Sequence, residues 1–554
     1  MKAAMPSATR HQYQPPSQRS LQRPRQRLRR PWRRFLHPLT AICAVQAVLS
    51  LTLIWSNTAY IDEADYLWVG RLEIAHWLHG TPWPSAYAYR LFSGSPFIYP
   101  PLGAIADSIG GLAVARILSL VFMLAATVLL YFTASWLISR TGAVFAAALW
   151  AFSEPALRLA FATYDPLSVL LTALSALLVV QAGYRRRGGA FVAAAAVALA
   201  LANMTAYSGI VIDPVVIAFA FFVWLPCMRA GQALARTAWL VGGWAALFGL
   251  LMTASHSWAG LLFTVVARNI ADHQSIAAIL NEILGYSGLI IGLAVIGGIA
   301  AINTENRSRA ALLVVLSFTV FIVPAVQLHD QTAWSIDKHL AYGIWFAAIV
   351  SAYGCGKFIH RLSGTKKPLT VFCCLVALSY IAANSLQSAW GRYHAWPDAG
   401  AFISSFRPAA AQTRGLIYVP GHEANIAEYY TPQGREWTRW SAALSLAPAG
   451  PRNAWRSYYS AQLQSGNYGV ITLFYATTFS SAPELPGSIL LSPHGSTTVQ
   501  TLLGLVGDNS GEPGLPALTL ALEQNRGYRL VAVGPYDGSN DYSIYAIWQK
   551  KAQK

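Results

Sequence analysis

The spacing of long apolar runs constrains the fold of this chain more than any other feature. A helix needs about 20 predominantly apolar residues to cross the hydrocarbon core of a bilayer, which is about 30 Å thick. Eleven runs near that length lie at 39–56, 113–138, 142–160, 165–182, 189–204, 209–226, 237–255, 284–302, 310–327, 340–358 and 369–386. Only 11% of the 554 residues are charged, whereas soluble domains have about a quarter. We therefore predict a mainly α, polytopic membrane protein with about 11 transmembrane helices.

Basic residues gather on one side of these runs. The first 38 residues contain nine arginines, one lysine and no acid, and their many Pro, Gln and Ser residues predict a disordered cytoplasmic arm over 1–38 that touches anionic lipids. With the arm inside, its side of the membrane carries 22 basic residues and the opposite side, up to residue 390, carries 6. The positive-inside rule then predicts a multi-pass protein of the cell (inner) membrane with an extracytoplasmic C-terminal region. The net charge of +17 thus reflects topology, and no nucleic-acid partner is expected.

Acidic residues show the opposite distribution. Of the thirteen Asp and Glu residues before residue 390, only Glu305 falls on the predicted cytoplasmic side. Asp62, Glu63 and Asp65 form the densest group, directly after the first apolar run. Carboxylates at a membrane surface are costly unless water or a partner stabilises them, so they indicate a functional site. The alternative is a solvated loop in which Asp62 and Asp65 only cap a helix.

The sequence changes character after Ser388, where shorter apolar stretches alternate with helical patterns. Strands are predicted at 415–419, 469–475, 528–533 and 543–548, and helices at 398–406, 422–430, 453–464 and 516–525. This alternation predicts an extracytoplasmic α/β domain over 389–554. The transmembrane domain then covers 39–388 and includes a long outer loop at 57–112. Neither domain contains the nucleotide-phosphate motif GxxxxGKS or GxxxxGKT.

Short motifs follow one another in a definite order. They are Asp62-Glu63 with Tyr66 and Gly80, Pro100-Pro101-Leu102, Ala115-Arg116, Arg158 with Asp165, and Lys338-His339 with Tyr342. This order resembles that of the GT-C superfamily of integral-membrane glycosyltransferases, in particular the group of the protein O-mannosyltransferases and the lipid A aminoarabinose transferase. The resemblance covers residues 39–390 and, by layout, the C-terminal domain. One position departs from the pattern, because Tyr99 stands where some members have a lysine before Pro-Pro-Leu.

The resemblance implies a glycosyltransferase that moves a sugar from a polyprenyl-phosphate donor to a lipid, glycan or protein acceptor on the extracytoplasmic face. Such a donor is already activated, so the enzyme needs a base for the acceptor hydroxyl and cations for the departing phosphate. The family position makes Asp62 the expected base, with Glu63 orienting it or holding the acceptor and Asp165 converging from another segment. Displacement from the opposite face of the sugar predicts inversion at the anomeric carbon.

The remaining site residues are expected to bind substrate, and they are Tyr66, Arg116, Arg158, Lys338, His339 and Tyr342. Basic side chains at the level of the outer headgroups suit a phosphate group. Two site residues could instead have purely structural roles, in which Arg116 only extends its charged end to the membrane surface and Asp165 only starts a helix together with Pro166.

No cofactor is certain from the sequence. A divalent metal has one candidate site, formed by His256, His273 and His329 with Asp272 or Asp330. A single histidine near a membrane surface more often only makes a hydrogen bond, so an ordinary structural role also fits these residues.

Three other functions fit parts of the sequence. A membrane transporter or flippase needs ionisable residues near the bilayer midplane and repeated halves, and the sequence shows neither pattern. A non-catalytic assembly protein would use the outer α/β domain to bind partners. An oligosaccharide ligase of cell-envelope glycan assembly would use the same site with a polyprenyl diphosphate donor.

Overall fold

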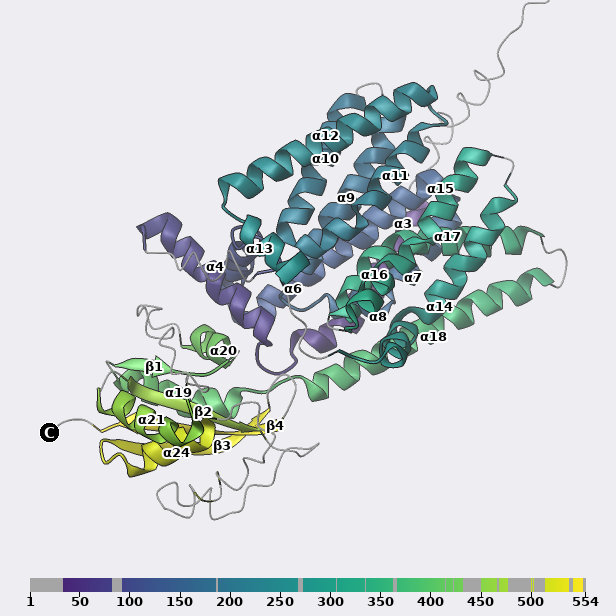
Figure 1. Cartoon of the computed structure of the whole chain (residues 1–554). Coiled ribbons are helices and arrows are strands. Elements are labelled where there is room, and N and C mark those ends of the chain that lie inside the picture. Colours follow the sequence, from purple (N-terminus) through teal and green to yellow (C-terminus); the bar gives the residue numbers. More distant parts are fainter. Residues whose placement is uncertain are drawn as a thin grey trace, which may run out of the picture.

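The computed structural model describes residues 33–81, 92–185, 188–267, 273–304, 306–333, 335–361, 366–413, 415–421, 423–431, 450–465, 468–476, 500, 502, 514–537 and 542–551. The predicted basic arm lies outside these residues, except for 33–38, which belong to the first helix. Helices make up most of the described chain, and a small sheet lies near its C-terminal end (Figure 1).

Each predicted apolar run coincides with one helix or with two consecutive helices. In chain order these are α3 (Arg33–Ile54), α6 (Tyr99–Leu137), α7 (Arg140–Ala151) with α8 (Glu154–Arg158), α9 (Asp165–Tyr184), α10 (Gly188–Thr205), η1 (Tyr207–Ile212) with α11 (Asp213–Trp224), α12 (Ala230–Ala254), α14 (Ile276–Ile302), α15 (Arg307–Ser317) with α16 (Thr319–Asp330), α17 (Ile336–Arg361) and α18 (Lys366–Ala395). Nine helical segments of the described chain are long and apolar enough to cross a bilayer. The protein is therefore a multi-pass membrane protein, and the predicted mainly helical fold class is confirmed.

Small residues let the membrane helices approach one another closely. At the contact of α14 with α17, a Cβ on Gly297 would lie 2.2 Å from the carbonyl oxygen of Val350, and one on Gly354 would lie 2.6 Å from the Cα of Gly297. Close packing of this kind stabilises helix pairs in a bilayer, where the hydrophobic effect does not drive helices together. The contact fixes α17, whose first turn carries Lys338 and His339.

The outer loop predicted at 57–112 contains helix α4 (Ile61–His79). The acidic residues Asp62 and Glu63 lie in its first turn, where negative charge is favourable. The helix ends at Gly80, whose φ of 64° is the left-handed conformation common after a helix C-terminus. The segment that the resemblance assigns to a short helix ending in glycine is thus helical.

The same predicted loop also contains the start of α6. Pro100 and Pro101 occupy the first turn of α6, where a helix needs no amide donors, so the helix begins at Tyr99 instead of at the predicted residue 113. Gly110 and Gly111 interrupt the helix before it continues as an apolar span. Residues 82–91 lie outside the described chain, and most of the rest of the predicted loop is helical.

The C-terminal region contains all eight elements that the sequence predicts. They are α19 (Gly400–Gln412), β1 (Leu416–Tyr418), α20 (Glu423–Tyr430), α21 (Trp455–Gln464), β2 (Tyr468–Ala476), α24 (Leu515–Gln524), β3 (Tyr528–Asp537) and β4 (Tyr542–Lys550). The strands form one sheet in the order β1-β2-β4-β3, in which only β1 and β2 are parallel.

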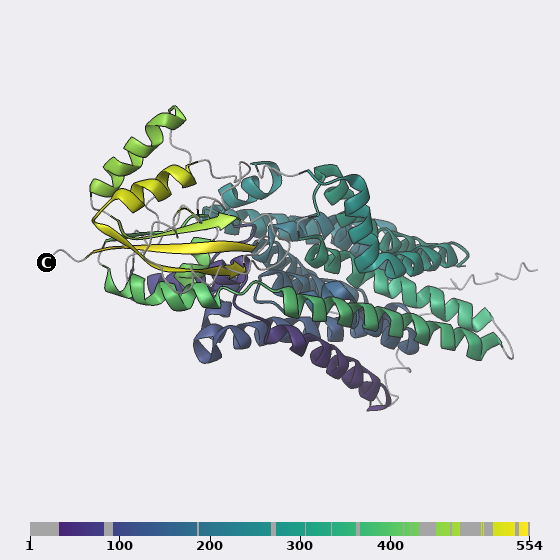
Figure 2. The ribbon, with the colours of Figure 1, turned by 90° about the horizontal axis from the view of Figure 1, so that it is seen from below.

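Helices cover both faces of this sheet (Figure 2). In β2, Val470 packs in the cluster that contains Phe402 of α19, while its neighbour Ile471 packs in the cluster that contains Leu518 of α24. Successive side chains of a strand point to opposite faces, so one strand contributes to both clusters. The α/β character predicted for this region is thereby confirmed.

The C-terminal region is attached to α4 and α6 through α20. Arg71 of α4 forms an ion pair with Asp107 of α6, and its Nη1 donates a hydrogen bond of 2.8 Å to the backbone oxygen of Tyr429. The hydroxyl of Tyr429 donates to Asp107 Oδ1 over 2.8 Å, and the Arg71 guanidinium lies 4.6 Å from the centre of the Tyr429 ring. One arginine therefore links two helices of the N-terminal half to the C-terminal region.

Two buried carboxyl groups, Asp65 of α4 and Glu428 of α20, lie in the two helices that form this contact. Burial, and then the charge of Asp62, raise the pKa of Asp65 well above its usual range. Burial, and then the charge of Asp65, raise the pKa of Glu428 as well. The contact between α4 and α20 is therefore most stable when these carboxyl groups carry a proton.

We predict that Asp65→Asn and Glu428→Gln raise the melting temperature of the full chain in detergent at pH 8 and leave it nearly unchanged at pH 4. The pKa of such a carboxyl group is about 4 in the unfolded chain and higher in the folded protein. The group stabilises the fold fully below about pH 4, and this stabilisation is lost as the pH rises through the pKa of the folded state. The amides never ionise, so they avoid this loss. Glu523→Gln, at an exposed position of α24, is the control. A melting temperature unchanged at pH 8 would contradict the prediction.

We also predict that Gly70→Ala destabilises the contact between α4 and α6. A Cβ at this position would lie 2.0 Å from the carbonyl oxygen of Pro100, so the helices must separate, at a cost of about 1–3 kcal/mol. The measurement is thermal unfolding of the full chain in detergent, which should show a lower melting temperature. Gly285→Ala is the matched control, because a Cβ there meets no atom within 4 Å. Equal melting temperatures for the two variants would show that α4 and α6 are not in this contact.

Candidate active site

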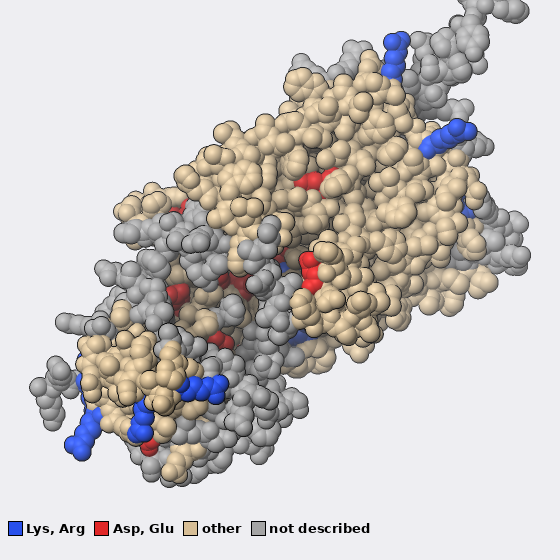
Figure 3. All heavy atoms as spheres, in the orientation of Figure 1, with Lys and Arg blue, Asp and Glu red and all other residues tan. Residues whose placement is uncertain are grey.

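Two carboxylates and two basic side chains lie together at the end of the membrane helices nearest the C-terminal region, and they come from three helices. Lys338 Nζ of α17 lies 3.1 Å from Asp62 Oδ2 of α4 and 3.4 Å from Asp165 Oδ2 of α9. His339 Nε2 lies 3.8 Å from Asp165 Oδ1. We call Asp62, Asp165, Lys338 and His339 the acid–base cluster. Figure 3 shows acidic side chains in the hollow between the two parts of the molecule.

The first turns of the three helices place these side chains. Asp62 follows the start of α4 at Ile61, Asp165 is the first residue of α9, and Lys338 is the third residue of α17. Asp165 does start α9 and Pro166 follows it, as the structural alternative expects, but the Asp165 carboxylate also has charged neighbours. Its carboxylate accepts no hydrogen bond in the described chain and instead faces Lys338 and His339.

The two acids differ in their access to solvent. The side chain of Asp165 is 0% exposed and that of Lys338 is 6% exposed, whereas that of Asp62 is 35% exposed. Taking charges out of water is expensive unless opposite charges compensate, so the Lys338–Asp165 pair forms the floor of the cluster. Asp62 is consequently the acid of the cluster that an incoming molecule reaches.

Aromatic rings form a wall beside Lys338. The Tyr164 ring centre lies 5.9 Å from Lys338 Nζ and 4.5 Å from the ring centre of Tyr66, which also contacts Phe92. Burial raises the pKa of Tyr164 to about 12, so its hydroxyl stays protonated at neutral pH. Tyr342 lies one turn after Lys338 on the same helix and is also buried. The predicted Tyr66 and Tyr342 therefore lie close to the cluster, and Tyr164 is a residue that the sequence did not single out.

Glu63 and Arg116 form a buried ion pair away from solvent. Arg116 Nε donates to Glu63 Oε1 over 2.8 Å, and Nη2 donates to Oε2 over 2.7 Å, with side-chain exposures of 1% and 0%. Further hydrogen bonds of Arg116 go to backbone oxygens at the end of α3 and just after it, those of Ile54, Ser56 and Thr58. The predicted phosphate contact of Arg116 is therefore not what the structure shows, and the guanidinium does not reach the membrane surface either.

Glu63 in turn holds two further segments. Its Oε1 accepts a hydrogen bond of 2.8 Å from the backbone amide of Ala162, and its Oε2 accepts one of 3.0 Å from the amide of Tyr60. The carboxylate thereby connects the start of α4 with the segment that precedes α9. Glu63 and Arg116 position Asp62 and Asp165, and neither is accessible to a substrate.

A second charged network adjoins the cluster. Arg158 Nε and Arg392 Nη2 each lie 3.0 Å from Asp337 Oδ2, and Arg392 also bonds to Glu154 Oε1 over 2.5 Å. The Arg158 guanidinium lies over the rings of Phe161 and Trp396, at 4.5 and 5.1 Å. Because Asp337 precedes Lys338 in the chain, this network fixes the first turn of α17.

Sequence reasoning did not single out Asp337, Arg392 and Glu154. Glu154 and Arg392 lie more than 200 positions apart in the chain, and no local pattern connects them. The only signal was Asp337 itself, an acid next to the outer pair Lys338-His339 in a chain with few charges.

The candidate metal site is not assembled in the described part of the chain. No group of three or more His, Cys, Asp or Glu side chains close enough to hold a metal ion occurs there. His256, His273, His329 and Asp330 are among the described residues and form no such group, whereas Asp272 lies outside them.

The comparisons with known proteins concern the fold. The sequence matches no protein-family model and no curated protein. The structure of ArnT from Cupriavidus metallidurans in the apo state superposes with a TM-score of 0.53 at 13% identity, covering 92% of this chain and 97% of that one. Oligosaccharyltransferase AglB from Archaeoglobus fulgidus, in complex with an inhibitory peptide and a dolichol-phosphate, gives 0.53 at 13% identity, covering 78% and 69%. The apo form of the Archaeoglobus fulgidus oligosaccharyltransferase gives 0.51 at 13%, covering 80% and 70%.

These similarities define a class of architecture. The chain has the GT-C fold, as the order of its motifs implies. The likeness to ArnT extends over nearly the whole of both chains, so it includes the C-terminal α/β region as well as the membrane helices.

We predict that Glu63→Gln destabilises the protein strongly. The substitution leaves the Arg116 charge buried without its counter-ion, which costs about 3–5 kcal/mol in comparable buried pairs. Thermal unfolding of the full chain in detergent should show a large drop in melting temperature. Asp330→Asn, which removes an exposed carboxylate, should change it little. If Glu63→Gln were as stable as Asp330→Asn, the buried pair would not support the site.

Proposed function

We propose that this chain is a glycosyltransferase that moves a sugar, hexosyl or pentosyl, from a polyprenyl-phosphate donor to a lipid, glycan or protein acceptor. The observation that carries the proposal is the convergence of Asp62, Asp165, Lys338 and His339 at one end of a GT-C membrane domain. A dolichol-phosphate is bound by AglB, which shares this fold, and this supports a lipid-borne phosphate as the donor.

Asp62 is the proposed general base. It is the accessible acid of the cluster, and it can take the proton from the acceptor hydroxyl once that hydroxyl lies within hydrogen-bond distance. The acceptor oxygen forms the new bond to the anomeric carbon, while the bond from that carbon to the phosphate oxygen breaks. The phosphate leaves with the electron pair, and attack from the opposite face inverts the anomeric carbon.

Lys338 and His339 are the proposed phosphate contacts, together with Arg158. The ammonium of Lys338 already lies beside Asp62, so it can stabilise negative charge that develops next to the base. The Nη1 atom of Arg158 is buried and has no hydrogen-bond partner in the described chain, so it is available to a phosphate oxygen. Tyr66 and Tyr342 are proposed to line the substrate cavity, whereas Glu63 and Arg116 act only by positioning.

The topology that accompanies this function is also a proposal. The protein lies in the cell (inner) membrane. Its basic N-terminal arm 1–38 is in the cytoplasm, its transmembrane domain covers 39–388, and its α/β domain 389–554 is on the extracytoplasmic side. The distribution of basic residues supports this orientation. The acid–base cluster then faces the extracytoplasmic side, where lipid-borne sugars are the available donors.

An oligosaccharide ligase is the second candidate, and the likeness of the fold to AglB favours it. The two activities differ in the donor, because a ligase transfers a whole glycan from a polyprenyl diphosphate. Profiling the surface glycolipids and glycans of a strain that lacks the protein distinguishes them by mass. Loss of one sugar residue supports the transferase, loss of a complete glycan supports the ligase, and no change would refute both.

We predict that Asp62→Asn lowers sugar transfer about 10²–10⁴-fold without unfolding the protein, because the amide cannot accept the proton. Transfer is measured in membranes of the deletion strain that carry the variant, by the recovery of the missing sugar. Asp330→Asn is the control, since it removes another outer carboxylate that lies outside the cluster. A transporter or an assembly protein would tolerate Asp62→Asn, and full recovery would therefore refute the proposal.

A further inference from the structure

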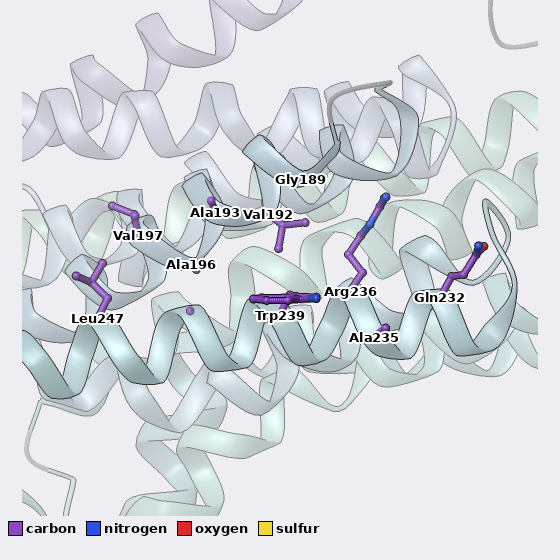
Figure 4. A pocket seen from close by; sticks show the side chains of 11 residues that line it. Gly189, Val192, Ala193, Ala196, Val197, Gln232, Ala235, Arg236, Trp239 and Leu247 are labelled. Atoms are coloured by element: carbon purple, nitrogen blue, oxygen red, sulfur yellow. The ribbon is translucent and has the colours of Figure 1, made fainter.

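A lateral groove lies between α10 and α12 (Figure 4). Its volume is about 770 Å³, and small or apolar side chains line most of it, among them Val192, Ala193, Ala196, Gly243 and Leu247. The groove therefore has the shape and the lining of a site for a hydrocarbon chain.

One end of the groove is polar and basic. Figure 4 shows Gln232 and Arg236 at this end, Val197 and Leu247 at the other end, and Trp239 between them. Arg236 is held in place, because its Nη1 donates to the backbone oxygen of Ala182 over 3.0 Å. A fixed guanidinium at the end of an apolar groove suits an anionic headgroup with an attached chain.

The charges around this end are all positive in the described chain. Arg185 follows α9 and Arg229 precedes α12, so both lie at the same end of the membrane helices as Arg236. The sequence contains no acid between Asp165 and Asp213 or between Asp213 and Asp272, and Asp213 starts α11 at the opposite end. The charge of this region therefore favours an anionic lipid over a zwitterionic one.

The length of the groove fits one leaflet. Arg236 and Leu247 are 11 residues apart on α12, which corresponds to about 16 Å along a helix axis. Half of the hydrocarbon core of a bilayer is about 15 Å thick. A lipid with its phosphate at Arg236 would thus extend one acyl chain along the groove as far as Leu247, near the bilayer midplane.

We propose that this groove binds one anionic phospholipid, from the leaflet on the side opposite the acid–base cluster. The phosphate contacts Arg236, and one acyl chain fills the space between α10 and α12. The lipid also completes the packing of α12, because only 22% of its apolar stretch is buried by protein, against 61% for α10. The site is separate from the proposed catalytic site and does not depend on the transfer reaction.

Native mass spectrometry of the full chain in detergent tests this proposal, with dioleoyl phosphatidylglycerol and dioleoyl phosphatidylcholine as probes. The wild type should retain one phosphatidylglycerol and bind phosphatidylcholine more weakly. Ala193→Trp adds a large side chain at an exposed residue that lines the groove and should weaken phosphatidylglycerol binding by at least about tenfold, because the indole takes volume that the acyl chain needs. Arg236→Gln should weaken it about fivefold, the usual effect of one basic residue at an anionic surface.

Two matched variants complete the experiment. Ala194→Trp places the same side chain on the next exposed residue, outside the groove lining. Arg309→Gln is matched to Arg236→Gln because Arg309 also donates to a backbone oxygen and lies by an aromatic ring. The oxygen is that of Leu137 and the ring is that of Tyr353. Both variants should bind phosphatidylglycerol as the wild type does. Equal binding by Ala193→Trp and Ala194→Trp, or equal loss in Arg236→Gln and Arg309→Gln, would overturn the proposal, as would equal retention of the two lipids by the wild type.

Discussion

The arrangement of the site depends on one buried ammonium group, Lys338, shared between Asp62 and Asp165. A buried lysine is stable only when opposite charges replace the water that it loses. The two carboxylates come from α4 and α9, and the ammonium comes from α17. The first turns of three helices that lie far apart in the chain must therefore meet at the same point. This requirement ties the chemistry of the site to the packing of the whole membrane domain.

Two further sets of charged residues hold these segments in place. The Glu63–Arg116 pair joins the start of α4 to α6 and to the segment before α9, entirely within the protein. Asp337, held by Arg158 and Arg392, fixes the first turn of α17 and connects it to α18, which leads to the C-terminal region. Both sets lie beside the acid–base cluster and hold the helices that carry it. The charges at this end of the membrane helices therefore divide into a few that solvent reaches, such as Asp62, and more that are buried and hold the helices together.

The two ends of the membrane domain differ in the lipid chemistry that they suit. The end with the acid–base cluster holds carboxylates beside bases, which suits a reaction in which a proton moves and a phosphate leaves. The opposite end carries Arg185, Arg229 and Arg236, with no acid beside them in the part of the chain that the structure describes, and this suits an anionic headgroup that stays intact. The same asymmetry of charge that supports the proposed topology thus also separates the proposed catalytic site from the proposed lipid site.

The sequence determined the helices, because hydropathy over about 20 residues decides whether a segment can cross a bilayer. It also determined the α/β elements after Ser388 and the order of motifs that indicates the GT-C fold. Only the tertiary structure decided the roles of individual charges. Arg116 and Lys338 have equivalent positions in the sequence, each near one end of an apolar run, yet Arg116 is enclosed with Glu63 and Lys338 lies beside Asp62. Helix packing sets which partner lies within a few ångströms, and the interaction of two charges depends on that distance.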